Sequence, residues 1–201
     1  AAAGVDRVVA GAAGEEVVSA AGGEGIIAAA AEERDGDERG DGDDVVFGGP
    51  GNDVALLGAG NDTFSWVPGC GSDTIEGQDG TDDLSFVGSL ANEAFDIAAN
   101  GGRVLFLRDV SAITQDLDDV ERIQLKALGG ADAVAVHDLT GTDITRVGID
   151  LAGTNPAAGD GAADAVTVDG TLGADVISLS SSATDRSEER RVGKECRLLC
   201  R

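Results

Sequence analysis

Five aspartates recur in one stretch of the chain at a spacing that could bring their carboxylates into line. Residues 39–85 read RGDGDDVVF, GGPGNDVAL, LGAGNDTFS, then, after two inserted residues, PGCGSDTIE and GQDGTDDLS. The sixth place of each nine-residue phrase is an aspartate: Asp44, Asp53, Asp62, Asp73 and Asp82. Carboxylates and the carbonyls of glycine-rich loops are the oxygen ligands that hard cations such as calcium prefer. The chemistry predicted is therefore cation binding.

Short strands must position these aspartates. The eighth place of each phrase is apolar (Val46, Ala55, Phe64, Ile75 and Leu84), with mostly polar neighbours on both sides. This alternation predicts a strand whose middle residue points into a core. If two phrases make one turn of a coil, Asp44 lies one turn from Asp62, and Asp53 one turn from Asp73. The acidic side chains then stack in rows that repel one another unless a cation lies between them.

The phrase resembles the calcium-binding nonapeptide of the hemolysin-type, or repeats-in-toxin (RTX), proteins. The resemblance implies an all-β fold, a right-handed parallel β-roll with two phrases per turn and calcium between successive loops. The implied calcium ligands are Gly40, Gly42, Asp44, Gly49, Gly51, Asp53, Gly58, Gly60, Asp62, Gly69, Gly71, Asp73, Gly80 and Asp82. The alternative is that the phrases are ordinary turns or flexible linkers, which does not explain a regular period.

The remaining sequence divides into three parts. Residues 1–38 resemble eroded repeats in which Val9, Val18 and Ile27 recur without the aspartates, although 28–34 could instead form a helical turn. Residues 86–185 keep short apolar runs and predict an irregular parallel β-solenoid, with Asp132, Asp164 and Asp175 as weaker ligands. Residues 186–201 resemble the translation of a sequencing adapter, with a short basic helix as the alternative.

The composition limits the partners of the chain. With 38 acidic and 14 basic residues, the formal charge is −24, which disfavours nucleic acid and anionic membranes and suits divalent cations. No apolar run is long enough for a transmembrane helix. The lack of methionine suggests an internal fragment of a longer protein. His137 is the sole histidine, and we expect it at a strand end facing solvent rather than in catalysis.

The predicted function is a calcium-binding structural module, not an enzyme, of a secreted or cell-surface bacterial protein. The resemblance implies type I secretion and folding on calcium outside the cell. Two alternatives remain open. The stretch could be the accessory module of a secreted metalloprotease, lipase or polysaccharide epimerase. It could also belong to an adhesin whose region after Phe86 binds a glycan or a neighbouring cell.

Overall fold

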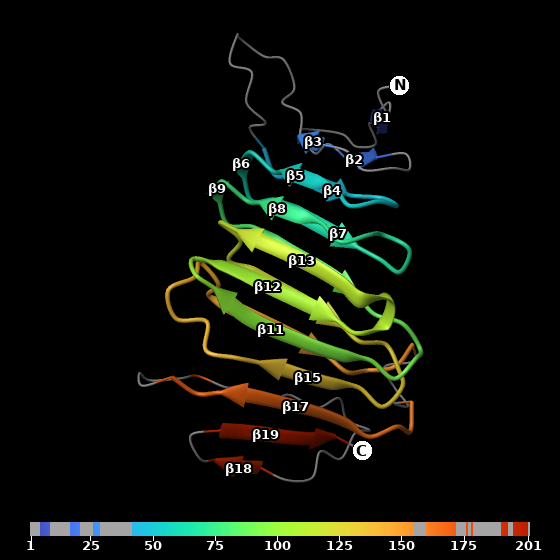
Figure 1. Ribbon diagram of the computed structural model, residues 1–201, viewed down its shortest axis with the longest axis vertical. Coiled ribbons are helices and arrows are strands. Elements are labelled where there is room, and N and C mark those ends of the chain that lie inside the picture. The colour runs from blue at the N-terminus through green and yellow to red at the C-terminus, as the bar shows by residue number, and fades with distance from the viewer. Residues whose placement is uncertain are drawn as a thin grey trace.

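The computed structural model is built almost entirely from short strands (Figure 1). It describes residues 42–154, 160–171, 176 and 178, and the backbone of strands 5–8, 17–20, 26–28, 190–192 and 195–200. The strands are β1 (Val5–Val8), β2 (Val17–Ala20), β3 (Ile26–Ala28), β4 (Val45–Phe47), β5 (Val54–Leu56), β6 (Ala59–Gly60), β7 (Thr63–Trp66), β8 (Thr74–Glu76), β9 (Asp79–Gly80), β10 (Asp83–Val87), β11 (Ala94–Asn100), β12 (Arg103–Arg108), β13 (Ile113–Asp118), β14 (Arg122–Lys126), β15 (Ala133–Val136), β16 (Arg146–Asp150), β17 (Asp164–Asp169), β18 (Arg190–Val192) and β19 (Glu195–Cys200). A short 3₁₀ turn at Val110–Ala112 is the helical element of this described part, so the expectation of an all-β chain is confirmed for it.

Two main sheets carry the chain. Sheet A has seven strands in the order β1-β2-β4-β7-β10-β14-β16, and sheet B has ten in the order β18-β19-β17-β15-β11-β12-β13-β8-β5-β3. From β4 to β10 the chain alternates between the sheets, apart from the small β6–β9 pair, and each strand pairs in parallel with the strand one turn away. Two phrases therefore make one turn, as the resemblance implies.

The register of the strands aligns the apolar residues of successive turns. In sheet A, Val46 pairs with Phe64 and Phe64 with Leu84; in sheet B, Ala55 pairs with Ile75. All five are fully buried, because alternate strand residues face the space between the sheets. The predicted inward residues are thus confirmed.

The expected continuous parallel coiling after residue 86 is interrupted. β11, β12 and β13 form an antiparallel meander, whose outer strands pair in parallel with β15 and β8. The turn Asn100–Gly102 joins the first two strands of this meander, and Gly101 has a φ of 71°, which a glycine adopts readily. Parallel pairing resumes in β14–β16 and β15–β17.

Aromatic side chains fill the core beside the meander. Trp66 stacks on Phe86 with ring centroids 4.0 Å apart, and Phe86 lies 4.5 Å from Phe106 and 6.0 Å from Phe95. All four side chains are at most 1% exposed. Trp66 is a packing residue, as expected from its place in the insertion.

The ends of the chain differ from two expectations. β2 and β3 pair in parallel with β4 and β5, which continues the coil backwards, but β1 pairs antiparallel with β2. In the C-terminal tail, β18 and β19 are strands, and β19 pairs with β17, so residues 190–192 and 195–200 do not form the short basic helix considered for this tail. Ala28, the first residue of the helical turn considered at 28–34, ends β3, and residues 29–34, Gly40 and Asp175 lie outside the described residues.

Candidate metal centre

The sixth-place aspartates are buried and linked from turn to turn. Along sheet A, the Asp44 backbone N–H donates to Asp62 Oδ1 (2.7 Å), and the Asp62 N–H donates to Asp82 Oδ1 (2.8 Å). At the start of the sheet B strands, the Asp53 N–H donates to Asp73 Oδ1 (3.0 Å). These five side chains are at most 4% exposed. The sequence therefore predicts which carboxylates lie together.

The second oxygen of several carboxylates has no hydrogen bond. Oδ2 of Asp62, Asp73 and Asp82 is buried, and so is Oε1 of Gln115, with no hydrogen-bond partner for any of them among the described residues. A Cβ added at Gly48 would lie 3.4 Å from Oδ2 of both Asp53 and Asp73, so both oxygens lie close to the Gly48 backbone. A buried polar atom without a partner costs about 1–3 kcal/mol, and more when it is charged. Buried carboxylate oxygens of this kind fit a hard cation.

Burial raises the pKa of these carboxyl groups. The pKa rises from 3.8 to about 6 for Asp62 and Asp73 and to about 7 for Asp82, first because burial disfavours the charged form. The backbone N–H bond to each group lowers the pKa, and the charge of the neighbouring aspartate in the row raises it again. Without a cation, these rows hold their negative charge at a cost in stability.

Fourth-place glycines let successive loops stack closely. A Cβ built on Gly60 would lie 2.0 Å from the carbonyl oxygen of Gly42, and one on Gly71 would lie 1.3 Å from that of Gly51. Only glycine permits this approach, so the fourth place is fixed by sterics as well as by any ligand role. The Gly71 carbonyl accepts from Trp66 Nε1 (2.9 Å) and Gln115 Nε2 (3.0 Å), so protein donors already engage this predicted ligand.

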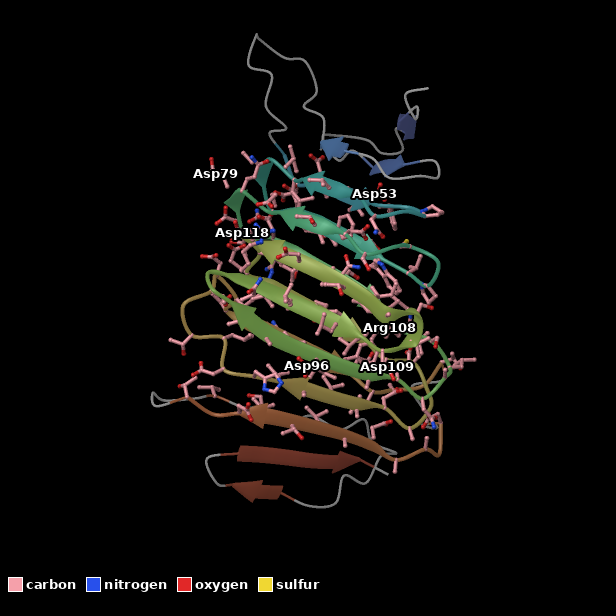
Figure 2. The ribbon with its side chains drawn as sticks, in the orientation of Figure 1. Asp53, Asp79, Asp96, Arg108, Asp109 and Asp118 are labelled. Atoms are coloured by element: carbon pink, nitrogen blue, oxygen red, sulfur yellow. The ribbon has the colours of Figure 1, made fainter. Side chains whose placement is uncertain are left out.

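The other predicted glycine ligands lie in the same two sets of loops. Gly42 and Gly58 lie in the loops that lead into sheet A, and Gly60 and Gly80 lie in the small β6–β9 pair within those connections. Gly49, Gly51 and Gly69 lie in the loops that lead into sheet B. Asp53 and Asp79, from one loop of each set, lie toward opposite sides of the molecule (Figure 2). The geometry thus gives two separate rows of oxygens.

The rows extend to residues that the strict aspartate pattern misses. The Asp82 N–H donates to Glu121 Oε2 (2.7 Å), which prolongs the sheet A row. A further row on sheet B links the Glu93 N–H to Asp132 Oδ1 and the Asp132 N–H to Asp164 Oδ1, both at 2.9 Å. Glu93, Gln115 and Glu121 each stand two residues before a buried apolar residue, a signal that the sequence contains.

An acidic cluster lies outside these rows. Carboxylate oxygens of Asp118, Asp119 and Asp143 lie within 4.8 Å of one another, and Asp119 and Asp143 are exposed. Burial, followed by the charge of Asp118, raises the pKa of Asp119. No sequence period marks this cluster, because Asp143 comes from a loop more than twenty residues away.

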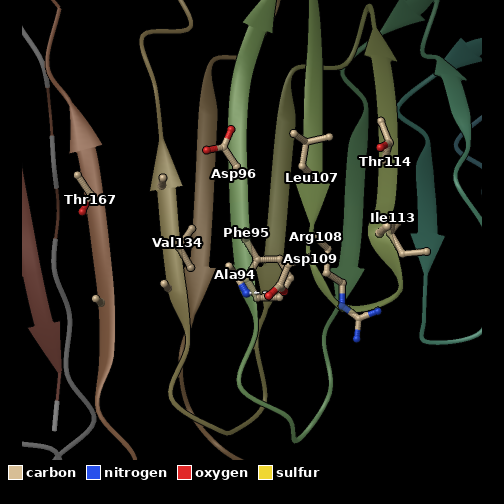
Figure 3. A pocket seen from close by; sticks show the side chains of 14 residues that line it. Ala94, Phe95, Asp96, Leu107, Arg108, Asp109, Ile113, Thr114, Val134 and Thr167 are labelled. Carbon is tan, nitrogen blue, oxygen red and sulfur yellow. Dashed lines mark hydrogen bonds between the residues drawn. The ribbon is translucent and has the colours of Figure 1, made fainter.

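The outer face of sheet B has a depression lined by small, apolar and charged side chains of β11, β12, β13, β15 and β17 and of the turn before β13 (Figure 3). Asp96, Leu107, Thr114 and Thr167 lie along it. His137 lies after β15, where Nδ1 is 2.8 Å from Asp169 Oδ2 and Nε2 is 3.0 Å from Asp96 Oδ2. The histidine therefore bridges neighbouring strands at a strand end, with a side chain 44% exposed.

No protein-family model, curated protein or solved structure matches this chain. The described part of the chain contains no helix that could span a membrane.

Proposed function

We propose that the coil is a calcium-binding structural module that folds fully only when the metal is bound. The observation that carries this proposal is the set of buried carboxylate oxygens of Asp62, Asp73 and Asp82, which have no hydrogen-bond partner among the described residues. Bound calcium would supply positive charge between stacked loops. The carboxylates of Asp44, Asp62 and Asp82 in one row, and of Asp53 and Asp73 in the other, would hold it with nearby loop carbonyls.

Calcium is preferred over magnesium for a physical reason. Calcium accepts about six to eight oxygens in irregular geometry, whereas magnesium needs a near-ideal octahedron and gives up its water slowly. Loops of glycine and aspartate provide many oxygens but no rigid octahedral frame. We interpret the coil, in line with the RTX resemblance, as a right-handed β-roll that passes into an irregular solenoid.

The same reasoning supports a secreted or cell-surface location. Extracellular calcium-binding modules have dissociation constants of about 10⁻⁴–10⁻³ M, a range that suits a module which folds on weak calcium sites. A chain with a charge of −24 gains stability from divalent cations by mass action, because they bind the folded rows and not the unfolded chain. We propose a structural role rather than catalysis, since the buried carboxylates form rows along the coil.

A calcium titration of the full chain followed by circular dichroism tests the proposal, with magnesium as control. We expect strand signal and melting temperature to rise with calcium and to fall with a chelator. Asp62→Ala should weaken the response more than Asp164→Ala, because Asp62 lies in the middle of a regular row. A structure and melting temperature that do not change with the chelator would refute the proposal.

A further inference from the structure

The buried polar side chains of sheet B change where the meander enters the sheet. Taken across the sheet from β5 to β17, they are Asp53, Asp73, Gln115, Arg108, Glu93, Asp132 and Asp164. They form two rows at different levels along the strands, because Gln115 pairs with Phe106, whereas Arg108 pairs with Ile113 and Phe95. β12 runs antiparallel, so its last residue, Arg108, lies beside the starts of its neighbours and contacts Glu93, the first residue of the row that continues to Asp132 and Asp164.

Arg108 is a buried cation with a specific partner. Its Nε donates to Glu93 Oε1 at 2.6 Å, and its Nη2 pairs with the same oxygen. The side chains of Arg108 and Glu93 are 4% and 0% exposed. The guanidinium carbon lies 5.4 Å from the centre of the Trp66 ring, within the range of a cation–π contact. The ion pair is thus enclosed by the aromatic core.

Glu93 uses its remaining polar atoms within the row. Its Oε2 accepts the Ser89 N–H at 2.6 Å, and its own N–H donates to Asp132 Oδ1. Both carboxylate oxygens of Glu93 therefore have protein partners. Asp62, Asp73 and Asp82 differ, since one oxygen of each has none and no described lysine or arginine pairs with them.

A second arginine pairs with carboxylates on the outer face of the meander. Arg103 on β12 contacts Asp116 (2.7 Å) and Asp118 (2.9 Å) of β13 and Glu76 (2.9 Å) of β8. Its pKa is raised, first by the hydrogen bond to Glu76. The meander thus has a cation on each of its faces, supplied by one strand.

We infer that Arg108 takes the place of a metal ion in the row of Glu93, Asp132 and Asp164 on sheet B, so that β10–β13 keep their fold without any divalent cation. Calcium dependence, which rests on the proposed function, is then confined to the loops of residues 42–82. Metal removal leaves a chain in which the meander and the rings of Phe86, Phe95 and Phe106 stay folded, while the coil before them, which includes Trp66 on β7, is destabilised and opens more readily.

Hydrogen exchange of the full chain in a chelator tests this inference by mass spectrometry. Peptides from β11–β13 should exchange about a hundredfold or more slowly than an unfolded chain, while those from β4–β8 exchange rapidly. Added calcium should then slow the β4–β8 peptides. Rapid exchange of β11–β13 in the chelator would overturn the inference.

Two variants test the ion pair itself. Arg108→Met keeps much of the stem but leaves Glu93 charged and buried, so protection of β11–β13 in the chelator should fall at least tenfold. Adding Glu93→Gln to this variant removes the orphaned charge and should restore most of the protection. If Arg108→Met leaves protection unchanged, or if Glu93→Gln rescues nothing, Arg108 is not the counter-ion of the row.

These outcomes are independent of the proposed calcium function. If calcium alters no peptide but β11–β13 stay protected through Arg108, the proposed function fails and the counter-ion role stands. If calcium slows β4–β8 but β11–β13 also need it, the proposed function stands and this inference fails.

Discussion

Replacing Asp82 by asparagine should change stability in opposite directions with and without calcium. The Asp82 side chain is fully buried, its Oδ1 accepts the Asp62 N–H, and its Oδ2 has no partner among the described residues. Its pKa rises from 3.8 to about 7. A rise of about 3 in this pKa means that the ionised carboxylate lowers the free energy of unfolding by roughly 4 kcal/mol.

Asp82→Asn removes this charge and keeps the acceptor oxygen. In a chelator at about pH 8, we expect the free energy of unfolding to increase, with about 4 kcal/mol as the upper limit. In excess calcium the same variant loses a ligand, and calcium affinity should fall about tenfold or more, which costs about 1.4 kcal/mol for each factor of ten.

Urea unfolding followed by Trp66 fluorescence measures both effects. The single tryptophan is fully buried and stacked on Phe86, so it reports directly on the coil. Asp79→Asn is the matched control, since Asp79 lies in the same loop, is exposed and loses the same charge. Loss of stability by Asp82→Asn in both conditions, or an equal gain by Asp79→Asn, would refute the argument from buried charge.

Three further predictions follow from the same contacts. In the chelator, stability should fall as the pH rises from about 4 to about 7, because Asp62, Asp73 and Asp82 bind protons more tightly when folded; calcium should abolish this trend in urea midpoints. Gly71→Ala should cost about 3 kcal/mol or more, since its Cβ would meet the Gly51 carbonyl, whereas Gly102→Ala, with nothing within 4 Å, should cost less than about 0.5 kcal/mol in the same assay. The pKa of His137 is raised, first by Asp169 and then by Asp96, so the bridge to these carboxylates should stabilise the fold below about pH 6.5 and weaken as the pH rises through the raised value. Thermal melting should therefore show that His137→Gln loses about 1 kcal/mol or less of stability at acidic pH and none at alkaline pH, relative to wild type.

The regular part of the structure could be predicted because its period is local. An apolar residue two places after each aspartate fixes both the inward face and the position of the carboxylate, as Phe64 and Asp62 show. The same relation holds for Glu93 before Phe95 and for Gln115 before Leu117. Extending the rule from aspartate to any acid or amide would have found these residues as well.

The meander could not be predicted from its alternation alone. The run Arg103–Arg108 alternates in the same way whether its strand runs parallel or antiparallel, since side-chain period carries no direction. The turn at Asn100–Gly102 was the available signal for a hairpin. Arg108 was missed for the same reason, because an arginine that ends a strand usually faces solvent, and its burial depends on Glu93 and Trp66 in neighbouring turns.

The meander also sets a rule of parity for insertions into such a coil. β11 and β13 run in the same direction because one reversed strand, β12, lies between them. The chain therefore leaves the meander in the direction in which it entered. An even number of added strands preserves the direction of the chain, whereas an odd number would reverse it and place the next loop at the opposite end of the strands. Natural or engineered insertions between β10 and β14 should therefore be tolerated when they add a whole hairpin, whereas the insertion of a single strand should disrupt the pairing of every turn that follows.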